Sequence, residues 1–336
     1  MLFHHNGHGV RWMQNSRRQF YIFDLELAAR KVGAMVPTMN VLVPVLQRMK
    51  DRGRTYSLRS NTATMLIGDM AVDVGQQFIV LLVRLSDTTT PNSVYSDPAA
   101  GQFNEHVKTD NVGADFGCHV IISTAPERGM PNVYTCAIER VPGLPFELVR
   151  RLLSKLLNFE YHENPMFFSY PHPAGGFDSN NQPRQDRCCP HVELRGRPSD
   201  SLINDINAGR ISGVSLVRSE AATPIGGAPY LTRSSSELKL GIDHNNLPAN
   251  LWASIRRTLQ LNAQAYNTAI IKYRIPNSKR TVTVELDAAT GAPLADMYIL
   301  SFELSNIFPF LAQSAMQIVR HLHDLAVPPF LSHRTI

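Results

Sequence analysis

The spacing of apolar residues changes along the chain, and it predicts strands and helices mixed through the whole length. Short runs rich in β-branched and aromatic residues, separated by turn residues such as Gly68 and Gly75, predict an antiparallel meander in the first half. Its strands are expected at residues 55–58, 64–69 and 77–85, and further strands at 19–25, 117–123 and 132–138.

Apolar residues recurring three and four positions apart predict amphipathic helices. Pro44 is expected to interrupt the first of them, and the last carries Pro309 in its first turns. Ser199 or Pro198 suits the start of a short helix in the second half. The helices are expected at residues 40–49, 145–159, 199–207, 248–263 and 305–325.

The second half repeats this mixture, with strands expected at residues 192–195, 214–219, 237–242, 268–274 and 281–286. Clustered Pro, Gly, Asn and Ser predict loops at 86–115, around one short helix, and at 160–191 and 221–236. The fold class predicted is α+β, two lobes of mostly antiparallel sheet with packed helices and a C-terminal helix. The lobes are expected at 1–160 and 192–336, joined by a linker or loop at 161–191.

Composition supports a folded chain, since 43% of its 336 residues are hydrophobic. Lys and Arg exceed Asp and Glu by 33 to 28, a net charge of +5 that permits a polyanionic partner. Four irregularly spaced cysteines do not suggest a disulfide framework. The polar first residues and the lack of a long apolar run predict a cytoplasmic protein without membrane insertion.

The positive charge is clustered, which makes it a candidate for phosphate contact. Arg48, Lys50, Arg52 and Arg54 form the densest run, opposed locally only by Asp51. A connection from a helix to a hairpin can present such charges to a phosphate backbone without a deep pocket. The alternative is an ordinary solvated turn.

Further basic groups lie on other predicted elements. Arg151 and Lys155 repel one another on one helix face, so a phosphate or merely Glu147 is expected to offset them. On a strand, Lys272 and Arg274 would share one face and Ile271 and Tyr273 the other. The complete set of basic candidates adds Arg150, Arg195, Arg197, Lys279 and Arg280.

Enzyme chemistry has weaker support. Glu237 and Lys239 fit half of a metal-dependent nuclease motif, with Asp200 or Asp205 as a second carboxylate, although so common a tripeptide is better explained by a strand with exposed alternating charges. Adjacent Cys188 and Cys189 with His191 lack the usual zinc spacing. Because phosphate-loop, dinucleotide-binding and hydrolase motifs are absent from the sequence, no catalytic residue, metal or cofactor is expected.

The order of elements resembles the lambda RexA family of phage exclusion proteins, and more weakly the DNA-binding subunit of the Kiwa anti-phage system. The segments that carry the resemblance are QFYIFDL, FIVLLVRLSD, GCHVIIS, NVYTCAIERV with PFELVRRLLSKLL, VELRGRPSDSLINDI, and TAIIKYRIPNSKRTVTVELDAATG. The chain departs from the family in its longer Pro/Gly-rich stretch at 160–191. The resemblance implies a cytosolic, dimeric, DNA-binding protein of phage defence with a basic cleft.

The predicted function is therefore non-enzymatic and largely sequence-independent binding of double-stranded DNA, by a homodimer acting as a sensor or regulator in anti-phage defence, in the manner of abortive infection. Two alternatives stay open. One is a metal-dependent nuclease, and the other is a subunit of a larger defence complex whose basic groups contact a partner protein.

Overall fold

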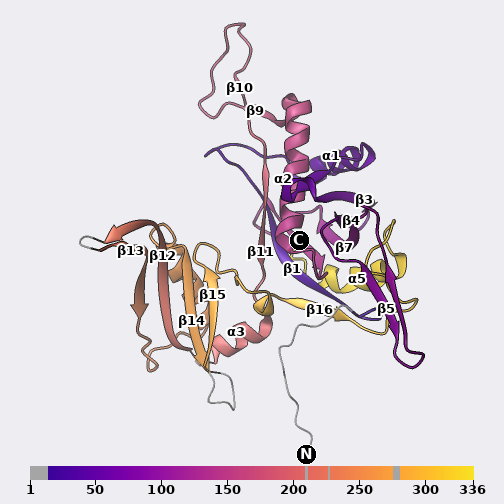
Figure 1. The fold of residues 1–336 in the computed structure, drawn as a ribbon. Coiled ribbons are helices and arrows are strands. Elements are labelled where there is room, and N and C mark those ends of the chain that lie inside the picture. Colours follow the sequence, from indigo (N-terminus) through magenta and orange to yellow (C-terminus); the bar gives the residue numbers. More distant parts are fainter. Residues whose placement is uncertain (1–13, 209–210, 226–227, 275–280) are drawn as a thin grey trace, which may run out of the picture. The chain divides into compact units, whose positions relative to one another are not determined.

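The apolar runs form strands and the amphipathic segments form helices, which confirms the predicted α+β class with its C-terminal helix (Figure 1). The computed structural model describes residues 14–208, 211–225, 228–274 and 281–336, without the side chains of 220–234. Two units are formed, one by the chain up to Leu194 together with Phe302–Ile336, the other by Arg195–Ser301. Residues 302–336 thus belong to the first unit, whereas the sequence prediction assigned them to the second lobe.

The first unit is built on an eight-stranded sheet in the order β11-β1-β8-β7-β4-β3-β2, with β16 also paired to β1. The antiparallel pairs β2–β3 and β3–β4 confirm the predicted meander, and β4–β7, β7–β8 and β8–β1 are antiparallel too. The strands are β1 (Arg18–Ala28), β2 (Tyr56–Leu58), β3 (Ala63–Asp73), β4 (Phe78–Asp87), β7 (Ala114–Ser123), β8 (Val133–Glu139), β11 (His191–Gly196) and β16 (Ser301–Leu304).

Helices cover both faces of this sheet, which is why its central strands are continuously apolar. Tyr21 and Phe23 of β1 pack against Phe146 at the start of α2. Phe20, on the opposite face, stacks on Phe302, which stacks in turn on His333 at the end of α5. The helices of this unit are α1 (Met39–Asp51), α2 (Phe146–Glu163) and α5 (Arg320–Ser332), with short 3-10 turns η1 (Arg59–Asn61) and η2 (Pro165–Phe168).

Two predicted loops contain pairing that the sequence did not indicate. The stretch expected to be a loop around a short helix forms an antiparallel hairpin, β5 (Ser93–Asp97) with β6 (Gln102–His106), whose residues are all exposed. The Pro/Gly-rich stretch after α2 holds a short ladder between β9 (Ser169–Pro171) and β10 (Gln185–Arg187). Neither hairpin has an apolar face, so no periodic signal marks them.

The last helix was predicted too early. The apolar spacing indicated a helix over residues 305–325, but residues 305–319 are neither helix nor strand, and α5 begins at Arg320. The apolar side chains of 305–319 divide between inside and outside, with Ile307 1% and Phe308 78% exposed. Pro44, expected to interrupt the first helix, lies within a continuous α1 because Leu42, Val45, Leu46 and Met49 are buried on both sides of it.

The second unit is a four-stranded antiparallel sheet in the order β13-β12-β14-β15. A helix followed by a hairpin occurs twice in it, first α3 (Asp200–Asn207) with β12 (Ile211–Ile225) and β13 (Ala228–Leu240). The second copy is α4 (Leu251–Asn262) with β14 (Thr268–Arg274) and β15 (Thr281–Asp287), and η3 (Asp296–Tyr298) follows. The loop predicted at 221–236 is thus mostly strand.

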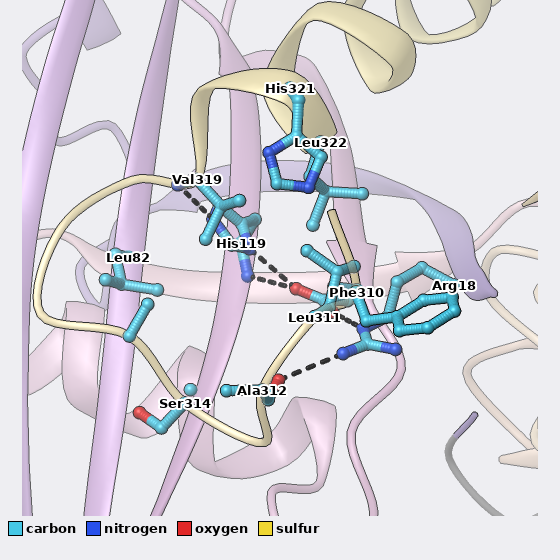
Figure 2. Close-up of a pocket in the computed structure, with 13 residues that line it drawn as sticks. Arg18, Leu82, His119, Phe310, Leu311, Ala312, Ser314, Val319, His321 and Leu322 are labelled. Atoms are coloured by element: carbon cyan, nitrogen blue, oxygen red, sulfur yellow. Dashed lines mark hydrogen bonds and ion pairs between the residues drawn. The ribbon is translucent and has the colours of Figure 1, made fainter. Parts of the chain in front are cut away.

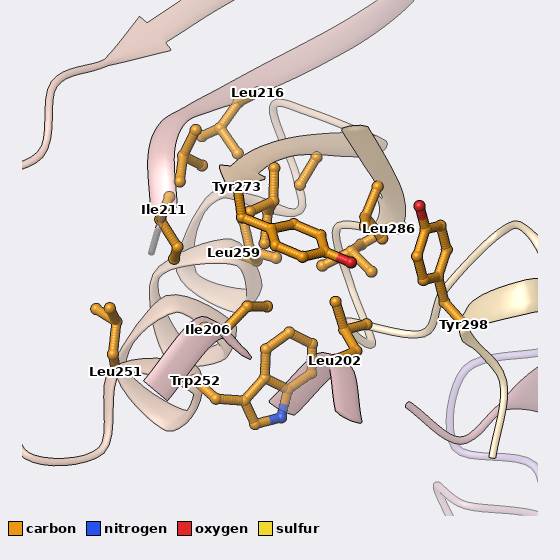
Figure 3. Close-up of a cluster of buried hydrophobic side chains, with 14 residues drawn as sticks. Leu202, Ile206, Ile211, Leu216, Leu251, Trp252, Leu259, Tyr273, Leu286 and Tyr298 are labelled. Carbon is orange, nitrogen blue, oxygen red and sulfur yellow. The ribbon is translucent and has the colours of Figure 1, made fainter. Parts of the chain in front are cut away.

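One face of this sheet and the two helices enclose the core of the second unit (Figure 3). Leu259 of α4 and Ile271 of β14 are fully buried, and Trp252 and Tyr273 are less than a tenth exposed. Both helices begin at side-chain caps, since the Ser199 hydroxyl accepts from Leu202 N and Asn250 Oδ1 accepts from Ala253 N. Ser199 is therefore confirmed as a helix start. None of the helices that the structure describes is long and apolar enough to cross a membrane.

Candidate nucleic-acid interface

The basic run at the end of α1 lies against acidic residues near the end of α2. Arg48 Nη2 lies 2.6 Å from Glu160 Oε1, and that carboxylate is buried. Arg52 and Arg54 both bind Glu163. Lys50 lies 3.5 Å from Asp51 and 4.0 Å from Asp69. The three arginines, which looked nearly unopposed in the sequence, are offset by acids more than a hundred residues away, because α1 packs on α2.

The basic residues of α2 are offset within their own helix. Glu147 accepts from Arg150 and Arg151 at 2.6 and 2.8 Å, and these hydrogen bonds lower the pKa of its carboxyl to about 2. Arg150 also donates to the carbonyl of Val192. Lys155 lies 4.9 Å from the ring centre of Phe159. Glu147 is thus the offsetting acid that the helical spacing suggested.

The late hairpin contrasts with both groups. Lys272 and Arg274 are exposed on one face of β14, while Ile271 and Tyr273 point into the core, as the alternation predicted. Within the described part of the chain, neither Lys272 nor Arg274 forms an ion pair. Their cross-strand neighbours are Thr283 and Thr281, which are neutral and exposed.

The outer face of this sheet changes character along the strands. Toward the β14–β15 turn it carries Lys272 and Arg274 with two threonines, and at the other end Glu285 and Glu237 appear. Lys239 of β13 is on this face and lies 4.0 Å from Glu237. The unopposed positive charge therefore gathers at the hairpin end, which we call the basic end and define by Lys272, Arg274, Thr281 and Thr283.

Net charge divides unequally between the units. Arg195–Ser301 contains 12 Lys and Arg against 8 Asp and Glu, a net charge of +4 out of the chain's +5. The remainder contains 21 against 20, so it is nearly neutral. The excess positive charge of the protein belongs to the second unit.

Four other basic residues that the sequence predicted as binding residues give less support for a phosphate contact. Arg195 and Arg197, at and just after the end of β11, are half-buried and have interaction partners. Lys279 and Arg280 lie outside the described residues, between β14 and β15 in sequence.

The candidate nuclease and zinc residues do not form a metal site among the described residues. Glu237 and Lys239 are exposed neighbours on one strand. Across the residues with described positions, no group of three or more His, Cys, Asp and Glu could hold a metal ion. His191 Nε2 lies 3.2 Å from Glu193, Cys188 is buried, and burial raises the pKa of Cys189.

A buried charged cluster in the first unit was missed by sequence reasoning (Figure 2). Arg18 Nε lies 2.7 Å from Glu139 Oε1, and His119 Nδ1 lies 2.7 Å from Glu139 Oε2. All three side chains are at most 6% exposed, from β1, β8 and β7. They line a pocket of about 110 Å³ together with Leu311, Leu322 and other apolar side chains. The available signal was charge within apolar strands, in GCHVIIS and CAIERV.

The hydrogen bonds of this cluster fix the state of the imidazole. The backbone N–H of Val319 donates to His119 Nε2 at 3.1 Å, so Nε2 carries no proton and Nδ1–H donates to Glu139. The guanidinium of Arg18 donates to the carbonyl of Ala312 at 3.0 Å. Burial lowers the pKa of Arg18, and the Glu139 carboxylate opposes that effect. Both polar atoms of the ring are engaged, so His119 here serves structure and not general-base catalysis.

No protein-family model matches the chain, and neither a curated protein nor a solved structure matches it.

Proposed function

We propose that the chain binds nucleic acid, double-stranded DNA in the first instance, through the basic end of the second unit. The observation that supports this most is the exposed pair Lys272 and Arg274 on one strand face, flanked by threonines and without an ion pair among the described residues. Lysine and arginine neutralise phosphates, and threonine hydroxyls donate to phosphate oxygens.

The two units differ in whether their basic residues are already paired with acids, and this difference favours one contact surface. Arg52 and Arg54 are held by Glu163, and Arg150 and Arg151 by Glu147. A phosphate would have to displace a carboxylate to reach these groups. Lys272 and Arg274 need no such exchange, so the contact is assigned to the second unit.

Binding of this kind is governed by phosphate charge. Each phosphate neutralised on a duplex contributes about −0.9 to the slope of log affinity against log salt. Affinity should therefore fall steeply with salt and vary little with base sequence.

The test is charge reversal, Lys272→Glu with Arg274→Glu, measured by fluorescence anisotropy on a labelled duplex over a salt series. We expect a loss of at least ten-fold in affinity at low salt and a salt slope smaller by about two. The control is Arg257→Glu with Arg320→Glu, which changes the net charge equally at exposed positions on α4 and α5. Equal losses in both variants would leave only a general charge effect and contradict the assignment.

The same titration separates other partners. Tight binding to single-stranded DNA or RNA with weak duplex binding would move the proposal to that nucleic acid. Binding to an acidic polypeptide with no nucleic acid bound at any salt would favour the protein-partner alternative.

Phage defence and a homodimeric state enter the proposal from the resemblance to the RexA family alone. The corresponding test is plaque formation on cells that express the wild type or the Lys272→Glu, Arg274→Glu variant. Protection by the wild type that the variant lacks would support the role. Equal plaque counts on cells with the wild type and on cells with neither protein would oppose it.

A further inference from the structure

Residues 305–319, which we call the strap, run from β16 to α5 over the first unit's sheet without regular structure of their own. Backbone bonds fasten its first part, where Ile307 N and Leu311 N donate to the carbonyls of Ser16 and Asn15 at 3.0 and 2.8 Å. The rest is fastened by the Gly117 N–H, which donates to the carbonyl of Gln313 at 3.2 Å, and by side-chain hydrogen bonds with the sheet.

The middle of the strap is held around one aspartate. Ser314 Oγ donates to Asp115 Oδ2 at 2.6 Å, and Arg84 Nε donates to the same oxygen at 2.9 Å. Gly117 lies so close beneath that a Cβ on it would be 2.7 Å from Ser314 Oγ. The glycine is therefore required for the strap to lie against β7.

The end of the strap depends on two adjacent amides. Ile318 N donates to Asp69 Oδ2 at 2.9 Å, and Val319 N donates to His119 Nε2 at 3.1 Å. Dashed lines in Figure 2 mark the bond from Val319 to His119 and the bond from Arg18 to Ala312. The imidazole accepts only while Nε2 is unprotonated, whereas a carboxyl group keeps an acceptor oxygen in either state.

We propose that the strap is an acid-released latch in which the bond from Val319 N–H to neutral His119 is the part that opens. A proton on Nε2 turns that nitrogen from an acceptor into a donor facing another donor. The bond to Val319 is then lost, and the strap end and the start of α5 are freed over the pocket.

A proton on Nε2 of His119 would face the Val319 N–H, itself a donor, in the closed state. Glu139 on β8 would attract it, but this carboxylate already faces Arg18 on β1 at 2.7 Å, so the buried group is neutral as it stands. His321 on α5 lines the same pocket, and its Nε2–H donates to the carbonyl of Pro309 at 3.0 Å. A proton on His119 would leave one net positive charge buried and the Val319 amide without its acceptor.

Apart from His321, the remaining ionisable groups at the strap are not imidazoles. Asp69 and Asp115 are carboxylates, Arg84 stays charged, and an imidazole is the side chain that changes charge between about pH 8 and pH 5. Strap release in that interval therefore reports a histidine.

The experiment is amide hydrogen exchange on the full chain between pH 7.5 and 5.5, corrected for intrinsic rates, with the His119 ring nitrogens followed by ¹⁵N NMR. We expect protection at Ile318 and Val319 to fall at least ten-fold as His119 Nε2 gains its proton. Protonation of the ring with protection unchanged would overturn the proposal, as would protection lost while Nε2 stays unprotonated.

Two variants test the proposed release of the strap independently. In His119→Gln the amide can still accept from Val319 and donate to Glu139, but it does not titrate, so strap protection should stay constant over this range. An acid loss equal to that of the wild type would overturn the proposal. Gly117→Ala serves as the loosened reference, since its methyl group would lie 2.7 Å from Ser314 Oγ and 3.2 Å from Ser314 Cα, and we expect it to push on the strap at neutral pH.

Discussion

Single residues in this protein owe their behaviour to whether a partner lies nearby. Arg150 and Lys272 are both basic side chains on regular elements, yet Arg150 binds Glu147 while Lys272 faces Thr283 across the strands. Residue type fixed the charge in each case. Only the surroundings decided whether that charge is open to a ligand.

Tyr273 gives a prediction at this scale. Burial raises the pKa of its phenol to about 12, and Tyr298 and Asp205 add to the effect. An acid whose pKa is raised by folding holds its proton in the folded state after the unfolded chain has lost it. Its contribution is complete below the ordinary value of 10 and is lost as the pH rises toward 12.

Tyr273→Phe should therefore reduce the alkaline loss of stability of the second unit. Urea unfolding at pH 9 and pH 11 should show the wild type losing about 1 kcal/mol more than the variant between the two. Tyr95→Phe, at an exposed position of the β5–β6 hairpin, is the control and should follow the wild type. Identical alkaline losses for Tyr273→Phe and the wild type would contradict the assignment.

Elements with a clear apolar stripe were predicted well, and those without one were not. α2, α3, α4, β14 and β15 lie where the spacing placed them, because a buried face imposes a period on the sequence. The strap had an equally helical spacing, but Asp69 and His119 accept from its backbone N–H groups and Asp115 accepts from its Ser314 hydroxyl, and these bonds compete with a helix. Those partners come from distant strands, so no local pattern reveals them.

The helix α4 offers a matched pair of substitutions. Leu259 is fully buried and Leu261, two positions later, is 77% exposed. Leu259→Ala should destabilise the second unit by about 2–5 kcal/mol, because it leaves a cavity between α4 and the sheet. Leu261→Ala should change stability by about 0.5 kcal/mol or less.

The measurement is hydrogen exchange of the amides of β12 and β14. Faster exchange in Leu259→Ala alone is the expected result. Equal effects from the two variants would mean that α4 does not cover the core as described.

At the scale of the whole molecule, charge is distributed by unit. The nearly neutral first unit neutralises its basic clusters internally, and the second unit carries the excess. The second unit contains a helix followed by a hairpin twice. The sequence did not indicate this, because it shows no repeat at a fixed period. Core positions that correspond in the two segments need only be apolar, so their hydrophobic pattern can agree while the residues differ.

This division predicts that the basic run of α1 serves stability more than binding. Arg52→Gln with Arg54→Gln removes two partners of Glu163, and should lower the free energy of unfolding by about 1 kcal/mol. Duplex affinity should change less than two-fold, measured in the same anisotropy assay as Lys272→Glu with Arg274→Glu. A loss as large as that of the latter variant would place the contact on the first unit instead.

The sequence by itself determined the α+β class, the meander, most helices and the two faces of β14. An element with one buried face carries apolar residues at the period of that element. Tertiary structure alone decided which charges are neutralised, where residues 302–336 pack, and that Arg18, His119 and Glu139 meet beneath the strap. Those outcomes depend on contacts between residues from about 20 to 300 positions apart, and no local pattern records such a contact.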